Sequence, residues 1–511
     1  MMNNNMLLKD AALFEIKYEG KDFYEPSTAG EVFWKENGVY LSAKQPVCAI
    51  RISWENSVTE PEKVFGDAWE RGYGDLAWKN VDKNAIFPWY CAQIKNGTVY
   101  TYGVRTQPNA MCWWSISKEK ITLTADVRCG TKGVCLQDRI LHVADVVSEE
   151  YHEESQRALS LFCKKMCDAP RLPEHPIYGG NDWYCNYGHN SYEKIIEHTK
   201  RIVACAGESE NPPYMVIDDG WQLCHFPSSK DEENYNGGPW KYCNRNFGDM
   251  QKLANEIRGI GARPGIWFRP LLTAEKMPES MILRTQYGKN VLDPSMPEVL
   301  EQITCDLKEI RKWGYELIKH DFTTFDIFGL WGFEMGNELT MGDWTFHDRT
   351  RTTAEIIKVL YHTIREAARD AVIIGCNTIS HLSAGIFELQ RTGDDTSGKE
   401  WAVTQKMGIN TLAFRMCQHE TFYLCDADCV GITKQVPWEK NKLWLDLLSK
   451  SGTPLFVSIA EDAYEKEVVD CVSQAFKRAS RSVKASVPLD WEKTQLPQYW
   501  LSQFGTDVYE W

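Results

Sequence analysis

The stretch Tyr315-Glu316-Leu317-Ile318-Lys319-His320-Asp321 combines an apolar strand pattern with a charged end. Side chains alternate along a strand, so Lys319 and Asp321 face one way while His320 faces the other. An amphipathic helical pattern at 297–313 comes directly before it. A helix that leads into a short apolar strand is typical of a parallel α/β fold.

The same alternation continues on both sides of this stretch. Strands are expected at 177–183, 214–218, 263–268, 315–321, 372–376, 386–391, 411–415 and 453–458. Helices are expected between them, for example at 191–205, 250–260, 297–313 and 353–369. Eight β-then-α units in succession predict an α/β fold built on a (β/α)8 TIM barrel. The segment 322–348 is long for a βα loop, and long loops at that face usually build the site.

Residues outside this region have a different pattern. Short alternating runs separated by turn residues recur at 11–18, 39–42, 49–54, 98–105 and 120–127, and a helix is expected at 149–166. They predict an N-terminal β-sandwich domain over 1–170, followed by the catalytic barrel over 171–485. The tail, 486–511, is expected to be short, with at most a small β element.

Composition narrows the class of partner. The chain has 511 residues and a net charge of −14, which argues against nucleic acid or an anionic membrane surface as a main partner. No apolar run reaches the roughly 18 residues of a transmembrane span, and no signal peptide is visible. The 62 aromatic residues (Trp 20, Tyr 22, Phe 20) suit a sugar ligand, whose C–H faces stack on rings. We expect a small oligosaccharide or glycoside substrate. The composition leaves open whether the protein forms a homo-oligomer.

The 17 cysteines are scattered and odd in number, so they predict reduced thiols in a cytoplasmic protein rather than a disulfide framework. Cys425 and Cys429, with Asp426 and Asp428 between them, form the one pair that suggests a metal. No second Cys/His pair follows at finger spacing, so no metal and no organic cofactor is expected.

Several candidate site residues stand at the ends of the expected strands. Lys319 favours the ionised form of Asp321, which is the form that a glycosyl nucleophile needs. Asp218 and Asp219 are adjacent carboxylates, which repel each other unless a ligand's hydroxyls bind them. Trp267 and Trp183 could stack on a sugar ring. For each residue a structural role is the alternative: ion pair, helix cap or core.

The segment Arg391-Thr392-Gly393-Asp394-Asp395 supplies the last carboxylates. In an extended backbone, Arg391 and Asp395 share a face and Asp394 points elsewhere. A retaining glycosidase needs two carboxyl groups about 5–5.5 Å apart across the glycosidic bond. If the ends of these strands are neighbours, Asp321 and Asp395 supply that pair.

As a set, these motifs resemble those of the retaining α-galactosidases and α-N-acetylgalactosaminidases of glycoside hydrolase families 36 and 27, with family 36 the closer. The likeness covers residues 174–460 and rests on the motifs at 216–221, 261–267, 292–295, 318–321 and 391–395. The N-terminal β-domain agrees with the family 36 layout. Two departures are His320, where the family usually has a large aromatic residue, and the missing full C-terminal β-domain.

The resemblance implies roles for individual residues. Asp321 matches the family's nucleophile, and Lys319 matches a ligand of the sugar hydroxyls. Asp218 and Asp219 match the pair that holds the hydroxyls at C4 and C6. The following residues match other family positions: Trp183 and Trp267 the aromatic ones, and Asp395 the general acid/base that follows Arg391 by four residues. An alternative alignment makes Asp394 the acid/base.

The sequence therefore predicts a retaining exo-acting α-glycosidase, an α-galactosidase first of all. An α-N-acetylgalactosaminidase, a galactosyl-transferring transglycosidase and a non-catalytic galactoside-binding protein are the alternatives. The residues near Cys376-Asn377-Thr378 are where galactose and N-acetylgalactosamine could be distinguished. The acid/base is expected to have a raised pKa.

Overall fold

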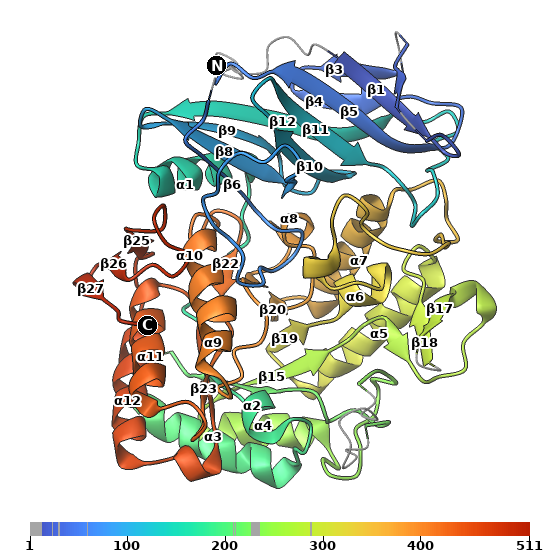
Figure 1. Ribbon diagram of the computed structural model, residues 1–511. Helices are drawn as coiled ribbons and strands as arrows, with labels where there is room; N and C mark the ends of the chain where they lie inside the picture. The colour runs from blue at the N-terminus through green and yellow to red at the C-terminus, as the bar shows by residue number, and fades with distance from the viewer. Residues whose placement is uncertain are drawn as a thin grey trace.

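The computed structural model describes residues 13–22, 24–28, 31–58, 60–207, 209, 211–225, 236–286 and 289–511. Figure 1 shows two β-sheets, formed by the N-terminal part of the chain, above a larger α/β region. A small C-terminal sheet lies at the side of that region.

The N-terminal part forms two six-stranded antiparallel sheets, consistent with the predicted β-sandwich. The first contains, in spatial order, β2 (Glu25–Pro26), β1 (Leu13–Tyr18), β5 (Val47–Glu55), β11 (Lys120–Asp126), β10 (Met111–Ile116) and β7 (Phe87–Pro88). The second contains β3 (Val32–Lys35), β4 (Gly38–Leu41), β12 (Leu141–Tyr151), β9 (Thr98–Val104), β8 (Tyr90–Lys95) and β6 (Lys63–Gly66). Buried aromatic rings join the two, such as Tyr102 on β9 and Trp114 on β10, whose centroids are 6.0 Å apart.

The larger region is a nine-stranded parallel sheet that curls round in the manner of a TIM barrel. Its spatial order is β22 (Leu424–Asp426), β21 (Leu389–Arg391), β20 (Val372–Gly375), β19 (Leu317–His320), β15 (Arg263–Phe268), β14 (Tyr214–Ile217), β13 (Tyr178–Asn181), β24 (Leu455–Ile459) and β23 (Cys429–Ile432). The two end strands, β22 and β23, are consecutive pieces of chain. The sheet therefore has eight positions in chain order, and the seventh is split in two.

Helices cover the outside of this sheet (Figure 1). The longer ones are α3 (Tyr192–Ala206), α4 (Met250–Ile260), α5 (Pro297–Trp313), α7 (Thr353–Ala368), α11 (Trp438–Ser451) and α12 (Lys466–Ala479). Their ends follow local chemistry. Asp249 caps α4 by accepting a hydrogen bond from the Lys252 N–H at 2.9 Å, and Gly261 ends it in the left-handed region at φ 113°.

The prediction of a strand at 411–415 is wrong. These residues form the helix α10 (Thr411–Arg415), which continues α9 (Trp401–Val403) and a π-helical turn over Thr404–Asn410. Leu412, Ala413 and Phe414 are all buried, so the run shows no alternation that would separate strand from helix. The seventh strand position belongs instead to β22 and β23, the segment first considered for a metal.

The helix expected at 149–166 begins late. Residues 149–151 continue β12, since Glu149 to Tyr151 pair with Thr101 to Val99 on β9. The helix α1 covers Ser155–Met166. At the other end of the chain, β25 (Val487–Pro488), β26 (Tyr499–Ser502) and β27 (Gly505–Val508) form the small β element. No helix in the described part of the chain is long and apolar enough to span a bilayer.

A buried ion pair joins the N-terminal part of the chain to helix α10. Asp67, directly after β6, accepts hydrogen bonds from Arg415 Nε at 3.0 Å and from Gln418 Nε2 at 2.7 Å. The side chains of Asp67 and Arg415 are 2% and 1% exposed. The pair therefore anchors the start of the segment 67–73 against α10.

We expect Asp67→Ala to lower the free energy of unfolding by about 3–5 kcal/mol, because it leaves the Arg415 charge buried without its partner. Urea denaturation measures this change. The control is Glu465→Ala, which removes the partner of Lys434 from an exposed ion pair at 2.6 Å. Equal effects of the two substitutions would contradict the anchoring role.

Candidate active site

Most of the candidate residues lie at the carboxyl ends of neighbouring parallel strands. Asp218 and Asp219 follow β14, Asp321 follows β19, and Trp267 is the penultimate residue of β15 between them. Arg391 ends β21, two places beyond β19 in the sheet. This edge is where curled parallel sheets carry their sites.

Asp321 is held as a carboxylate by its surroundings. Its Oδ2 accepts a hydrogen bond from Trp267 Nε1 at 3.0 Å, and its Oδ1 accepts one from the Phe322 N–H at 2.8 Å. Burial alone would raise the pKa of Asp321, but Lys319, Arg71 and these hydrogen bonds lower it below its usual range. His320 faces away, with its ring against Tyr361, as the alternation predicts.

Lys319 joins two strands through a buried ion pair. Its Nζ lies 2.7 Å from Asp218 Oδ2, which also accepts a hydrogen bond from Asn181 Nδ2 at 2.6 Å. Burial would lower the pKa of Lys319, but the Asp218 charge holds it well above its usual value. Lys319 is therefore a cation at the center of the site.

The surroundings of Asp219 raise its pKa, whereas those of Asp321 lower the pKa of that carboxyl group. Burial raises the pKa of Asp219 to about 7, and the negative charges of Asp218 and Asp321 add to this effect. Gln222 Nε2 donates to its Oδ1 at 2.6 Å. The adjacent acids thus differ, since Asp218 is paired with a lysine while the pKa of Asp219 is raised to about 7, so that Asp219 is partly protonated near neutral pH.

The two aromatic candidates lie differently. Trp267 is 1% exposed and packs against Trp240, so the part of it that acts on the site is the indole N–H on Asp321. Trp183 is half-buried at the start of the short helix α2 (Trp183–Asn186), with its ring 5.4 Å from that of Tyr187.

The two carboxylates after β21 turn to different partners. Asp395 Oδ1 lies 3.2 Å from Arg391 Nη2, whereas Asp394 Oδ1 lies 2.8 Å from Arg71 Nη2. Gly393 comes directly before them, with its α-carbon against the π-helical turn, where an added Cβ would lie 1.8 Å from the Met407 carbonyl oxygen. The close packing at Gly393 leaves no room for a larger residue.

The expectation of a raised pKa for the acid/base candidate is wrong for Asp395 in this structure. Burial acts to raise the pKa of Asp395, but Arg391, Lys319 and Arg71 together lower it below its usual range. Lys319 and Arg71 also lower the pKa of Asp321. Both carboxyl groups therefore lie in the field of the same two cations.

Arg71 and its neighbour Glu70 were not singled out from the sequence. The backbone N–H of Gly72 donates to the Thr392 carbonyl at 2.7 Å, which places this N-terminal segment beside the end of β21. Glu70 is fully buried and accepts a hydrogen bond from the Gly332 N–H at 3.1 Å. The only signal in the sequence was the run 67–73, where charged residues stand among aromatic ones within the expected β-sandwich domain.

The segment 322–348 and Cys376 complete the surroundings of Arg71. Trp331 stacks on Phe325 at 4.5 Å, and the Arg71 guanidinium lies 5.5 Å from the Trp331 ring. The Sγ of Cys376, one residue beyond β20, is 3.2 Å from Arg391 Nη1 and 3.9 Å from Arg71 Nη1. Cys376 therefore lies between the Arg391 and Arg71 guanidinium groups.

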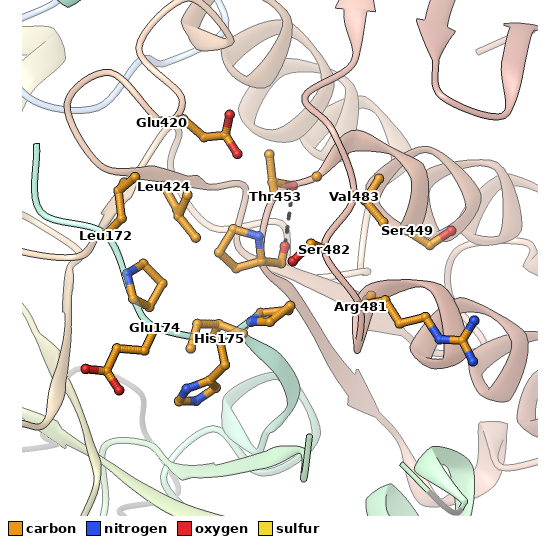
Figure 2. Close-up of a pocket in the computed structure, with 16 residues that line it drawn as sticks. Leu172, Glu174, His175, Glu420, Leu424, Ser449, Thr453, Arg481, Ser482 and Val483 are labelled. Atoms are coloured by element: carbon orange, nitrogen blue, oxygen red, sulfur yellow. Dashed lines mark hydrogen bonds between the residues drawn. The ribbon is translucent and has the colours of Figure 1, made fainter. Parts of the chain in front are cut away.

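A separate pocket opens at the other end of the curled sheet (Figure 2). Its lining includes residues that precede or begin strands, such as Ile177, Leu424 and Pro454, together with His175 and Arg481. The candidate aspartates lie at the opposite strand ends. Among the residues that the structure describes, no group of three or more His, Cys, Asp or Glu side chains could hold a metal ion.

No known family model matches this chain. Its structure is similar to that of an α-galactosidase from Thermus thermophilus in complex with p-nitrophenyl α-D-galactopyranoside. The two are 16% identical with a TM-score of 0.61, over 97% of this chain and 98% of the other.

Two further solved structures are similar. One is the A355E variant of the GH36 α-galactosidase AgaA from Geobacillus stearothermophilus in complex with 1-deoxygalactonojirimycin, at 12% identity and TM-score 0.58 over 92% and 73% of the two chains. The other is the galactosidase domain of the α-galactosidase-sucrose kinase AgaSK, at 14% and 0.55 over 93% and 73%. At these identities the likeness establishes the fold.

Proposed function

We propose that this protein is a retaining exo-acting α-glycosidase and that its substrate carries a terminal α-galactosyl unit. The observation that carries the proposal is the position of Asp321 and Asp395 just beyond the carboxyl ends of β19 and β21, two places apart in the same parallel sheet. Lys319 and Arg71 lower the pKa of both carboxyl groups. Double displacement requires two carboxyl groups, one on each side of the glycosidic bond. The galactosides bound to the structural neighbours support the choice of sugar.

Asp321 is the proposed nucleophile. Its carboxylate attacks the anomeric carbon while the bond to the leaving oxygen breaks, which gives a glycosyl–enzyme ester of inverted configuration. The N–H groups of Trp267 and Phe322 each hold one of its oxygens, so the carboxylate is oriented before the substrate arrives. Little reorganisation is then needed in the transition state.

Asp395 is the proposed acid/base. It gives its proton to the leaving oxygen and later takes one from the water that attacks the ester. Both acids contact an arginine, but Asp395 is the more exposed at 45% and lies 3.2 Å from Arg391, whereas Asp394 is 35% exposed and lies 2.8 Å from Arg71. We therefore assign the proton transfer to Asp395 and a supporting role to Asp394.

The remaining residues bind the sugar. Asp218, Asp219 and Lys319 present acceptors and donors in one buried cluster beside Asp321, which suits the hydroxyls of a neutral ring. The half-buried Trp183 offers a ring for the apolar face of the sugar. The buried Trp267 acts instead through its N–H.

Asp321→Ala should lose nearly all turnover of aryl α-galactosides, because no carboxylate remains to form the ester. With an activated aryl substrate, added azide should restore cleavage and yield the β-galactosyl azide, since azide enters from the face that Asp321 used. NMR of the product shows the configuration. Unchanged activity in this variant would overturn the mechanism.

Asp395→Ala should reduce turnover of substrates with poor leaving groups by about 10²–10⁴-fold. Azide should now yield the α-galactosyl azide, because it replaces the water that attacks the intermediate. The matched variant Asp394→Ala tests the other assignment. If Asp394→Ala gives the α-azide and Asp395→Ala does not, Asp394 is the acid/base.

Arg71→Met should move both limbs of the pH profile of kcat/KM to higher pH. Activity needs Asp321 ionised and Asp395 protonated, so the acid limb follows the pKa of Asp321 and the basic limb that of Asp395. Arg71 lowers both pKa values, and its removal raises both. Arg139→Met, which breaks an ion pair with Glu355 at 2.8 Å, is the control and should leave the profile in place. Limbs that stay fixed in Arg71→Met would exclude this role.

A further inference from the structure

The seventh strand position is interrupted at a residue with an unusual backbone. β22 ends at Asp426 and β23 begins at Cys429, and between them Asp428 has φ 65°, in the left-handed region. Residues other than glycine rarely adopt this conformation, and such residues cluster at functional sites. The Asp428 N–H donates to Asp426 Oδ1 at 3.1 Å, which stabilises the turn.

This break directs the Asp428 carboxylate toward the chain that follows β21. Asp428 is 5% exposed, and donors from three places converge on its Oδ2. Arg391 Nη2 lies 3.2 Å away, and the Thr396 N–H donates at 2.8 Å, with Thr396 Oγ1 at 3.0 Å. The Tyr184 hydroxyl donates to the same oxygen. In an unbroken strand the backbone at Asp428 would be extended, and its carboxylate would not point toward these partners.

Two partners of Asp428 also hold the proposed acid/base, Asp395: one contacts its side chain and the other follows it in the chain. Arg391 Nη2 contacts Asp395 Oδ1 and Asp428 Oδ2 at the same distance, 3.2 Å. Thr396 is the residue directly after Asp395. Asp428 therefore fixes the residue that pairs with Asp395 and also the backbone that carries it.

We propose that Asp428 is a positioning residue that holds Arg391 and the segment 391–396 so that Asp395 can transfer its proton. The inference rests on the proposed function and extends it to the strand break. Asp428 itself does not touch the substrate. Tyr184, whose pKa burial raises well above its usual value, stays a neutral donor to it.

Asp428 also balances charge at Asp395. The charged and titratable groups around Asp395 come from several elements: Arg391 on β21, Lys319 on β19, Arg71 from the N-terminal segment, Tyr184 and Tyr187 at α2, Asp394 beside it, and Asp426 and Asp428 at the strand break. Asp428 offsets the Arg391 charge. Without it Asp395 would face an unbalanced guanidinium, which stabilises the carboxylate, so its pKa would fall further.

A residue that positions the acid has a signature that a purely structural residue lacks. Proton donation matters most when the leaving group is a poor one and least when it is an activated phenol. The rate decrease caused by replacing Asp428 should therefore depend on the leaving group. A general loss of folded protein would lower every rate by the same factor.

The experiment compares Asp428→Asn with wild type on a series of aryl α-galactosides that spans leaving-group pKa. We expect kcat/KM to fall about 10–100-fold for the poorest leaving groups and less than about 3-fold for dinitrophenyl, with the basic limb at lower pH. Asp306→Asn is the matched control, a 4%-exposed aspartate on α5 that is bonded to Gln302 outside the site. It should show neither change.

Equal losses across the series, or a basic limb that does not move, would overturn the inference. If Asp428→Asn does not fold, Thr396→Val removes one contact with Asp428 and should give the same dependence at smaller size. If Thr396→Val shows no dependence on the leaving group, the inference is overturned as well. Failure of the wild-type protein to cleave any member of the series is a separate result, which refutes the proposed function itself.

Discussion

Charge buried at the mouth of a curled sheet must be balanced locally, and this constraint organises the whole site. Three cations, Lys319, Arg391 and Arg71, lie among a larger number of carboxylates. Each bonds to at least one acid from a different part of the chain. Burial without a lysine or arginine partner favours the protonated form of a carboxyl group, as the raised pKa of Asp219 shows. The pairings therefore decide which acids are ionised, and through that which can attack and which can donate.

Two irregular features of the fold bring Arg71 and Asp428 to the site, which the regular strands do not supply. One is the N-terminal segment 67–73, which Asp67 anchors to α10 and which brings Arg71 to Asp394. The other is the break in the seventh strand, which brings Asp428 to Arg391. Both act at the segment that carries Asp395. The N-terminal part of the chain therefore belongs to the candidate site, because its segment 67–73 contributes Arg71.

The parts of the fold that the sequence predicted are those with strong periodicity. The helices α4 and α5 begin and end where their apolar patterns do. Asp249 caps α4 and Pro297 starts α5, and a glycine follows each helix. The run at 411–415 was misassigned because every face of it is buried. The true seventh strand escaped notice because its two pieces are three and four residues long, with charged residues at their junction. The pKa of Asp395 was expected in the wrong direction, because the charges of Arg391, Lys319 and Arg71 together outweigh the effect of burial.

The sequence by itself determined the α/β class, most of the strands, and the strand-end aspartates and lysine, because alternation and strand polarity are local properties that a short segment shows. It also placed Asp395 with Arg391, four residues apart. Only the tertiary structure decided that Arg71 and Asp428 meet these residues and that Trp267 is a buried donor. Those contacts join segments up to some 320 residues apart, as from Arg71 to Asp394, and no local pattern encodes them. The protonation preferences of the acids follow from such contacts, since each pKa reflects all the charges that folding brings near.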